Sequence, residues 1–485
     1  MKKIINISVI ILIILSISCE KELELKPKMN ILNEKAITSA KDLEAVLIGA
    51  YDGLQSGNVF GGNMIMFAEL LSDDAQVNES KLNNFGTKEI YNRATTVQLN
   101  PLRDMWRDCY GVINRVNNVI YIINNNKISG ADYEAAKTKL KAEALFIRAT
   151  VHFELCRFWA LPYDIDKQGQ NTQPGIPYRT EPTLSGFANL AMARNSVEDV
   201  YKRVINDLTA AETLLDSAKI ITSTSRISAM ACAAYLARVY FQKGDYIKAS
   251  EAANRVITNK NAAYKLNDAD NVSFSHLKQD GDYLKAIFQT PGDVATKESI
   301  FQLVNIESDQ SNAITYNYAT TDGTKPLFQP DTSFKYLFDS KDKRRTKYIS
   351  INKFANTIDV KKYRSTNPSD NVCILRLAEM HLIRAEANIS PGGNSNLDEA
   401  YESYNLLKER AYGKNYVPQT ILASNLLDSV RVQRRREMCF EGDRYHNLKR
   451  MKQALRNGVS WNDPSLIFKI PQEEMSGNSL MTQNP

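Results

Sequence analysis

The strongest constraint on how this chain can fold is the helical spacing of its apolar residues, which recurs along most of its 485 residues. The segment "TSAKDLEAVLIGAYDGL", residues 38–54, places one apolar stripe on a helix face, formed by Leu43, Val46, Leu47, Ala50 and Leu54. Ser39 and Asp42 precede this stripe with the spacing of a capping pair. Because an apolar stripe of helical period has to be buried against another element, the pattern predicts a body of packed helices.

Three further segments repeat this pattern, namely residues 105–123, 139–161 and 195–215. Pro162 is predicted to end the second of these helices, because proline cannot continue the hydrogen-bond ladder. The third helix is predicted to begin at Asn195, with Glu198 three residues later as its capping partner.

Two later regions are typical of helical hairpins. In residues 226–257 a helix of small and aromatic residues meets Gly244-Asp245 and a second helix follows, and residues 375–413 hold a similar pair around a Pro-Gly-Gly loop. The alternation of small and large residues resembles tetratricopeptide hairpins, although the regular spacing of about 34 residues is missing. Hairpins of this kind cannot bury their faces alone and have to stack.

The character of the chain changes between residues 261 and 370. "ESIFQLVNI" and "NTIDVKKYR" alternate like short strands among stretches rich in Asn, Asp, Ser, Gly and Thr. We therefore predict an all-α fold, a tetratricopeptide-like helical hairpin scaffold with long loop-rich excursions and a few short strands. The scaffold would span approximately residues 36–260 and 371–455, and residues 261–370 would be a loop-rich insertion on the ligand side of a single domain, residues 19–485.

Residues 1–18 resemble a bacterial lipoprotein signal peptide. Lys2 and Lys3 precede an apolar run that is shorter than the roughly 20 residues of a membrane-spanning helix. The small residues before Cys19 resemble a lipobox, in which the cysteine is acylated, so Cys19 is the predicted lipidation site. An ordinary cleaved signal with an incidental cysteine is the alternative. The acidic residues that follow at positions 20, 22 and 24 resemble a tag that sends some lipoproteins to the outer face of the outer membrane.

The charge balance and the cysteines argue against two classes of protein. The chain has 61 Lys and Arg, and without Lys2 and Lys3 the remaining 59 face 55 Asp and Glu. That near balance disfavours a nucleic-acid partner, which would need a concentrated basic face. The five cysteines after Cys19 are odd in number and lack metal-ligand spacing, which indicates buried free thiols and not a disulfide framework.

Five motifs follow one another in a specific order. "LIGAYDGL" with "ELLSDDA" comes first and "AEALFIRATVHFELCRFWALPY" second, and "LRLAEMHLIRAEA", "RRREMCFEGDRYHNLKRM" and "IFKIPQEEMSGNSLMTQNP" follow. Together they resemble the motifs of the SusD/RagB family of nutrient-binding outer-membrane lipoproteins. Asn447 stands where the family usually has an aspartate, and Lys469 replaces a proline of its tail. With Cys19, the resemblance covers nearly the whole chain.

This resemblance implies a binding protein and not an enzyme. It implies a lipid-anchored protein of the outer membrane that faces the cell exterior and captures oligosaccharides. It also implies a partner, a SusC-like TonB-dependent outer-membrane barrel, over which the protein sits as a hinged lid and to which it hands its ligand. An oligopeptide is the alternative ligand, since the same architecture resembles peptide-capturing lids.

The charged residues of these motifs are predicted to hold the scaffold together. They alternate in sign on apolar helices, as interhelical ion pairs do, and comprise Glu143, Arg148, Arg376, Glu379, Arg384, Glu386, Arg436, Glu437 and Arg444. The four histidines have no metal-ligand spacing, and neither a phosphate-binding loop nor a nucleophile elbow occurs. The sequence therefore predicts no catalytic residue, no metal site and no cofactor.

Candidate ligand contacts lie in the loop-rich excursions. Sugars bind aromatic faces and planar polar groups, and the stretch "ITYNYATTDG" offers both. The predicted ligand-binding residues are Asp73, Tyr91, Tyr283, Tyr316, Asn317 and Tyr318. The alternative is that the tyrosines pack the loops and that Asp73 caps a turn.

Two other classes of function stay open on the sequence alone. A tetratricopeptide scaffold lipoprotein that assists outer-membrane assembly from the periplasmic face would have regular repeats and a concave helical groove. A surface glycoside hydrolase would need two carboxylates facing each other across the scissile bond, an arrangement that spacing in a sequence does not reveal.

Overall fold

The structure is a computed structural model of the chain. It describes residues 37–77, 86–184, 191–215, 223–262, 264–266, 287–289, 296–306, 308, 313–318, 326–352, 356–363, 369–413, 416–418 and 421–485. Cys19 and the acidic residues after it lie outside these ranges. Within them, every helix is too short or too polar to cross a lipid bilayer.

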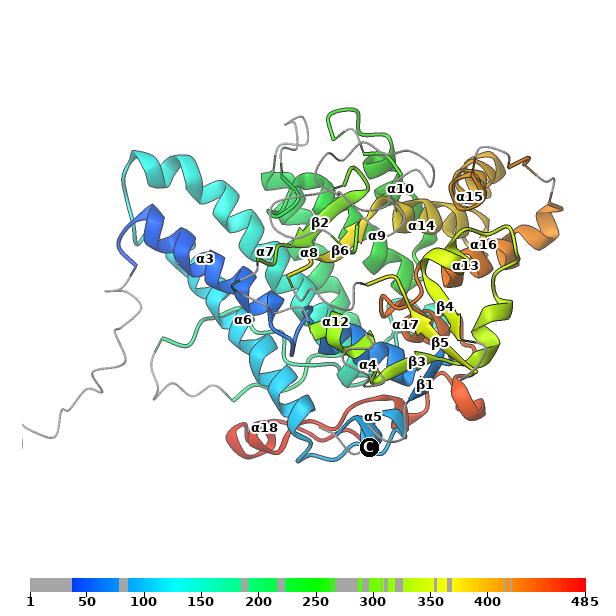
Figure 1. The fold of residues 1–485 in the computed structure, drawn as a ribbon. Helices are drawn as coiled ribbons and strands as arrows, with labels where there is room; N and C mark the ends of the chain where they lie inside the picture. The colour runs from blue at the N-terminus through cyan, green and yellow to red at the C-terminus, as the bar shows by residue number, and fades with distance from the viewer. Residues whose placement is uncertain are drawn as a thin grey trace, which may run out of the picture.

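The longer helices pack against one another in a continuous array (Figure 1). They are α3 (Ala40–Gln55), α6 (Asn100–Asn124), α7 (Ala131–Trp159), α8 (Val197–Leu214), α9 (Ala229–Lys243), α10 (Tyr246–Ile257), α14 (Leu377–Ile389), α15 (Leu397–Tyr412) and α16 (Ala423–Glu437). Contacts run from α3 through α6 to α10 and then through α14 to α15 and α16. The pairs α9–α10 and α14–α15 are the two expected hairpins, so the all-α, hairpin-based prediction is confirmed.

Short helices and strands gather beside this array. The shorter helices are α4 (Asn63–Leu71), α5 (Thr87–Tyr91), α12 (Ala313–Tyr318), α13 (Arg344–Lys347), α17 (Asp443–Arg450) and α18 (Gln472–Gly477), with 3₁₀ turns at Ile165–Lys167, Thr332–Tyr336, Arg456–Gly458 and Pro464–Leu466. In Figure 1, α4, α5, α12 and α18 lie along the lower side of the view. This side of the molecule carries the candidate site described below.

The described strands form three antiparallel pairs. They are β1 (Ala75–Val77) with β3 (Phe328–Pro330), β2 (Ser299–Leu303) with β6 (Val372–Arg376), and β4 (Ile349–Asn352) with β5 (Thr357–Val360). Strands β2 and β5 are the two that the sequence predicts. Because β2 pairs with β6 and β3 pairs with β1, two strands of the segment expected to be an insertion are hydrogen-bonded to strands of the scaffold. The boundaries between scaffold and insertion stay a prediction.

Local sequence signals set the ends of several helices. At the start of α3, the Asp42 N–H donates to Ser39 Oγ at 3.2 Å and the Asp42 carboxylate accepts from the Ser39 N–H at 3.0 Å, so the predicted capping box is confirmed. Gly244 ends α9 with a φ of 75°, a conformation that glycine adopts without strain, and Asp245 caps α10.

The cap predicted for α8 is wrong by one residue. Ser196, and not Asn195, accepts the Asp199 N–H, at 3.1 Å. The Asn195 side chain accepts the Tyr178 N–H at 2.8 Å and donates to the Asp199 carboxylate at 2.6 Å. A tertiary contact thus competes for the residue that the local pattern favours as the cap.

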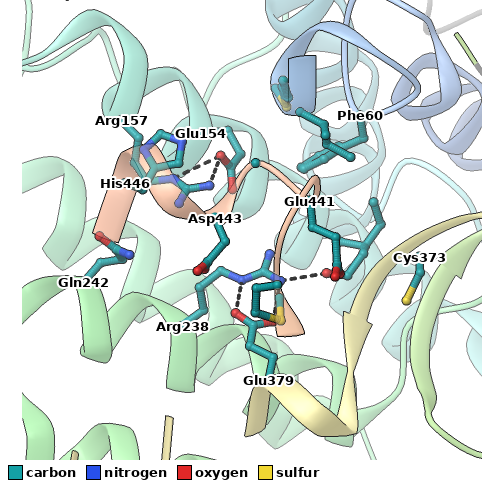
Figure 2. Close-up of a pocket in the computed structure, with 15 residues that line it drawn as sticks. Phe60, Glu154, Arg157, Arg238, Gln242, Cys373, Glu379, Glu441, Asp443 and His446 are labelled. Atoms are coloured by element: carbon teal, nitrogen blue, oxygen red, sulfur yellow. Dashed lines mark hydrogen bonds and ion pairs between the residues drawn. The ribbon is translucent and has the colours of Figure 1, made fainter. Parts of the chain in front are cut away.

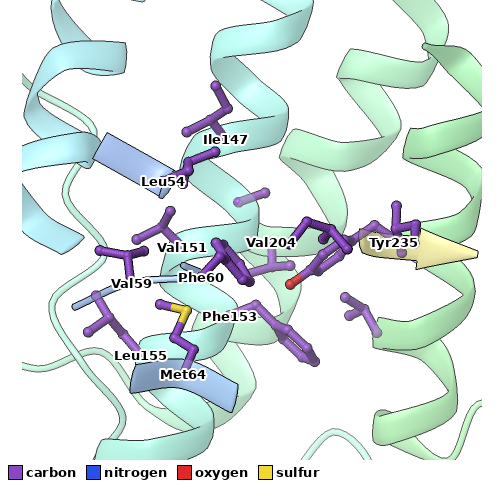
Figure 3. Packing of buried hydrophobic residues seen from close by; sticks show 14 of the residues in the cluster. Leu54, Val59, Phe60, Met64, Ile147, Val151, Phe153, Leu155, Val204 and Tyr235 are labelled. Carbon is purple, nitrogen blue, oxygen red and sulfur yellow. The ribbon is translucent and has the colours of Figure 1, made fainter. Parts of the chain in front are cut away.

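The apolar core continues from α3 to the C-terminal tail. Val59 and Phe60 from the turn between α3 and α4, and Met64 from the start of α4, lie beside apolar side chains of α7 (Figure 3). Phe153 of α7 packs edge-on against Tyr235 of α9, with ring centroids 5.9 Å apart. The core therefore holds the α3–α4 turn, which also forms one wall of the candidate site.

A buried carboxylate organises the other half of the scaffold. Glu437, at the end of α16, is contacted by Arg410 at 2.5 Å, Arg376 at 2.7 Å and Arg344 at 3.1 Å. Burial alone would raise the pKa of the Glu437 carboxyl, but these positive charges hold the pKa well below its usual range. The group is therefore an ionised structural centre.

Most other motif charges are paired as well. The pairs are Arg148–Asp207, Arg226–Glu143, Arg238–Glu379, Arg384–Glu402, Arg450–Glu386 and Arg444–Asp73. Arg436 instead donates to the Leu337 carbonyl oxygen at 2.6 Å. The predicted structural role of these charges is confirmed. The cysteines other than Cys19 are free thiols, four of them buried and Cys373 partly exposed.

The variant Glu437→Gln is expected to lower the free energy of unfolding by about 3–5 kcal/mol at neutral pH, because it leaves three buried arginines short of a countercharge. Urea unfolding followed by circular dichroism measures this change. Glu402→Gln is the matched control, since the Glu402 side chain is 59% exposed, and it is expected to cost less than about 1 kcal/mol. Equal losses in the two variants would contradict the structural role of Glu437.

The same contribution has a defined pH dependence. Because the folded-state pKa of Glu437 lies below the unfolded value, the stabilisation is complete above the usual pKa of 4.5 and is lost as the pH falls through the folded-state pKa. The stability gap between the parent protein and Glu437→Gln should therefore be constant above about pH 5 and shrink as the pH falls from about 4.5 towards about 2. A gap that stays constant over this range would count against the assignment.

Candidate functional site

Two hollows of the structure are compared as candidates for the binding site. The first is a small charged pocket (Figure 2). It encloses about 60 Å³, whereas ligand pockets usually hold roughly 300–1,000 Å³. Its charged groups are held in ion pairs, among them Arg238 with Glu379 at 2.6 Å and Arg157 with Glu154. This pocket belongs to the ion-paired scaffold.

The second hollow is larger and lies between the α3–α4 turn, α5, the start of α6 and α12. It encloses about 780 Å³. Five amide side chains line it, those of Asn58, Asn63, Gln98, Asn100 and Asn317, and we call it the amide hollow. Its apolar surface comes from Met66, Phe67, Leu99, Pro101 and Leu327. Size and mixed chemistry make it the candidate binding site.

Two of the amides in the hollow are hydrogen-bonded within the protein, and three make no hydrogen bond to another described residue. Asn58 Nδ2 donates to Asp108 Oδ2 at 2.8 Å, and Asn58 Oδ1 accepts from Asn63 Nδ2 at 3.2 Å. The side chains of Gln98, Asn100 and Asn317 make no hydrogen bond to another described residue. Because a primary amide both donates and accepts, these three groups suit a ligand that does the same.

Close backbone packing positions the wall formed by α12. The Ala313 N–H donates to the Gly61 carbonyl oxygen at 2.9 Å. A Cβ at Gly62 would lie 2.4 Å from the Gly57 carbonyl oxygen and 3.0 Å from Ala313 Cβ. Glycine at position 62 therefore allows the start of α12 to lie directly on the α3–α4 turn.

The far end of α12 is fixed by Tyr318. This residue is buried, its hydroxyl donates to the Phe440 carbonyl oxygen at 3.2 Å, and its ring stacks on that of Tyr363 with centroids 5.2 Å apart. Burial raises the pKa of the Tyr318 hydroxyl well above its usual value, so the group stays neutral. With Ala313 and Tyr318 both anchored, Asn317 is held on the wall of the hollow.

The start of α6 forms another wall and is braced by the C-terminal tail. The Gln472 N–H donates to the Val97 carbonyl oxygen at 3.0 Å, next to Gln98. In α6, Asp104 Oδ1 receives ion pairs from Arg103 and Arg107, each at 3.0 Å. Among the residues that the structure describes, no three His, Cys, Asp or Glu side chains converge on a position suited to a metal ion.

Two of the predicted ligand residues are engaged elsewhere and do not line the hollow. Asp73 is paired with Arg444 at 2.8 Å. Burial alone would raise the pKa of Asp73, but the hydrogen bonds and charge of Arg444 hold it below its usual value. The Tyr91 ring faces the Arg456 guanidinium, 3.5 Å from the ring centroid. The contact of Tyr91 matches the packing alternative that the sequence leaves open, whereas the ion pair of Asp73 with Arg444 differs from both the ligand contact and the turn cap considered for it.

Of the remaining predicted residues, the structure brings only Asn317 to the amide hollow. Tyr318 is an anchor beneath it. Tyr316 belongs to α12, where its backbone alone is described, and Tyr283 and Cys19 lie outside the described residues. Ligand contact by any of these residues stays a prediction.

Sequence reasoning missed Asn58, Asn63, Gln98, Asn100 and Asp104. They come from two separate segments, and the wall opposite them comes from a third segment about 200 residues later. The one usable signal was the stretch "SGNVFGGN", residues 56–63, whose three glycines mark a tight turn with flanking amides.

Two family models match the chain. One is described as starch-binding associating with outer membrane and matches residues 22–241, and the other is described as the SusD family and matches residues 336–464. The matched ranges contain every motif quoted above except the C-terminal one.

Relatives and solved structures extend the similarity to most of the chain. SusD-like protein P2 of Formosa agariphila is 24% identical over 99% of this chain and 99% of its own length. A crystal structure of a SusD superfamily protein from Bacteroides thetaiotaomicron has a TM-score of 0.80 at 24% identity and covers 93% of this chain and 100% of the other. A putative sugar binding protein from Bacteroides vulgatus has a TM-score of 0.76 at 25% identity, covering 93% and 99%.

The close approach of α12 to the α3–α4 turn can be tested with Gly62→Ala. The added Cβ would displace the Gly57 carbonyl or α12, so we expect a loss of about 1–3 kcal/mol in unfolding free energy and a shift of α12 in a crystal structure of the variant. Gly111→Ala is the control, because a Cβ there meets nothing within 4 Å in the middle of α6, and it should stabilise by up to about 1 kcal/mol. A crystal structure of Gly62→Ala in which neither the Gly57 carbonyl nor α12 has moved would contradict this packing.

Proposed function

Because this chain belongs to the SusD family, we propose that it is a cell-surface lipoprotein that captures oligosaccharides in the amide hollow and delivers them to a TonB-dependent outer-membrane transporter. The family model for starch-binding proteins associated with the outer membrane supports carbohydrate as the ligand and the outer membrane as the location. The fold shared with a putative sugar binding protein also supports carbohydrate as the ligand. The observation that carries the proposal for this chain is the set of three amides in the hollow, those of Gln98, Asn100 and Asn317, that make no hydrogen bond to another described residue.

The chemistry of the hollow suits a sugar. Each sugar hydroxyl donates one hydrogen bond and accepts others, and the free amides of Gln98, Asn100 and Asn317 offer both kinds of partner. Leu99 and Leu327 are partly exposed and offer apolar surface to the C–H face of a sugar ring. A site of this kind binds by complementary hydrogen bonds and burial and needs no reaction, so we propose a binding role and not catalysis.

An extended peptide is the second candidate ligand. Its backbone N–H and carbonyl groups also pair with side-chain amides. The same free amides therefore favour it on chemical grounds, and only a direct comparison of the two ligand classes separates them.

Binding of the soluble form that starts at residue 20 should be measured by calorimetry against a panel of neutral and acidic oligosaccharides and mixed peptides. We expect oligosaccharide binding, and we expect Asn317→Ala and Gln98→Ala each to weaken it at least about tenfold, close to 1.4 kcal/mol, because each removes a donor and an acceptor. Gln453→Ala is the control, an exposed amide that does not line the hollow. Binding of peptides alone, or sugar binding that both variants leave unchanged, would overturn the proposal.

The anchor is tested with Cys19→Ala in the native host. The parent protein should fractionate with the outer membrane and be cleaved when intact cells are treated with protease, because acyl chains hold it at the surface. The variant should be released into the soluble fraction. Cys373→Ser, which changes a thiol inside the fold, should leave the location unchanged. A Cys19→Ala protein that stays in the membrane would exclude lipidation at this residue.

A further inference from the structure

The charge of the amide hollow indicates what kind of sugar it accepts. We propose that the hollow selects uncharged oligosaccharides and excludes glycans that carry repeated carboxylate or sulfate groups. This inference rests on the proposed function, because it names the class of sugar bound at the same site.

Among the described residues that line the hollow, Asp104 is the single ionisable side chain. The two arginines nearest to it are already occupied. Arg107 contacts both Asp104 and Asp108, at 3.0 and 2.9 Å, and Arg103 contacts Asp104 at 3.0 Å and lies 3.9 Å from Glu473. Among these described residues, two positive charges face three negative ones, which leaves an excess of one negative charge.

An anionic sugar would meet an unfavourable environment here. A carboxylate or sulfate that leaves water needs a charged hydrogen-bond donor or several converging donors in exchange. In the part of the lining that the structure describes, neutral amides are present and no lysine or arginine is. The local negative excess at Asp104 adds repulsion, which acts over the first few ångströms in spite of salt.

An uncharged sugar finds a strong acceptor at the same place. Both ion pairs of Asp104 engage Oδ1, and Oδ2 makes no hydrogen bond to another described residue. The Asp104 side chain is 25% exposed, so a ligand can reach it. A hydroxyl that donates to Oδ2 forms a charge-assisted hydrogen bond, and the amides of Asn100 and Gln98 lie on the same wall to bind neighbouring hydroxyls.

Matched pairs of glycans test this selectivity. The probes are methyl-esterified and de-esterified oligogalacturonides, desulfated and native carrageenan oligosaccharides, and neutral malto-, xylo- and manno-oligosaccharides. The neutral member of any pair that binds should bind at least about tenfold more tightly, a difference of about 1.4 kcal/mol. Its affinity should be equal at about 0.05 and about 0.5 M NaCl, because no ion pair forms.

Two variants change the charge of the wall in the direction that acidic sugars require. Asn317→Lys adds a cation and Asp104→Asn removes the carboxylate, and each should raise the affinity for the acidic members at least about fivefold in a salt-sensitive way. Gln453→Lys adds the same charge outside the hollow and should change nothing. Circular dichroism of each variant shows whether it is folded. Because Asn317 lies in α12 and Asp104 in α6, one variant still tests the inference when the other does not fold.

The outcomes separate this inference from the proposed function. Tight binding of an acidic glycan that Asn317→Ala weakens would overturn the inference and leave the proposed function standing. Binding of peptides and of no glycan would overturn the proposed function and the inference with it. Glycan binding that no variant of the hollow affects would show that the site lies elsewhere, and it would overturn the inference.

Discussion

The ionised carboxylate of Glu437 is the interaction on which most of the scaffold depends. Its three arginine partners come from α13, β6 and α15, while Glu437 itself ends α16, so one buried anion joins four elements. A buried charge of this kind is tolerated only when it is fully paired. The pairing therefore fixes where each of these elements can lie, and it explains why so many charged residues stand on otherwise apolar helices.

The turn after Glu437 connects this network to the candidate site. The Phe440 carbonyl oxygen accepts from the hydroxyls of Tyr318 and Tyr363, at 3.2 and 3.0 Å, and the Gly442 N–H donates to Glu69 of α4 at 2.7 Å. Phe440 has a φ of 67°, a strained conformation for a residue with a side chain. The turn thus holds both α12 and α4, two of the elements that form the amide hollow, and the geometry of the hollow derives from the scaffold charges.

Local patterns in the sequence were sufficient for the scaffold and insufficient for the site. Helices, hairpins and the Ser39 cap follow from spacing over a few residues, and the alternating charges predicted ion pairs without revealing most partners. The hollow depends on contacts between distant segments, such as the hydrogen bond from the Ala313 N–H to the Gly61 carbonyl oxygen, and no periodic pattern in the sequence reveals such contacts. The tyrosines drew attention because sugars bind aromatic faces, yet Tyr318 packs beneath the site and the neighbouring Asn317 lines it.

The brace between Gln472 and Val97 has a consequence for biosynthesis. The loop that it supports is translated about 370 residues before the tail that supports it. Glu474 adds a second link when it accepts from the Trp106 indole N–H at 3.3 Å. A polypeptide that ends before Gln472 lacks both contacts, so the wall of the hollow beside α6 gains this support only after Gln472 and Glu474 have been synthesised.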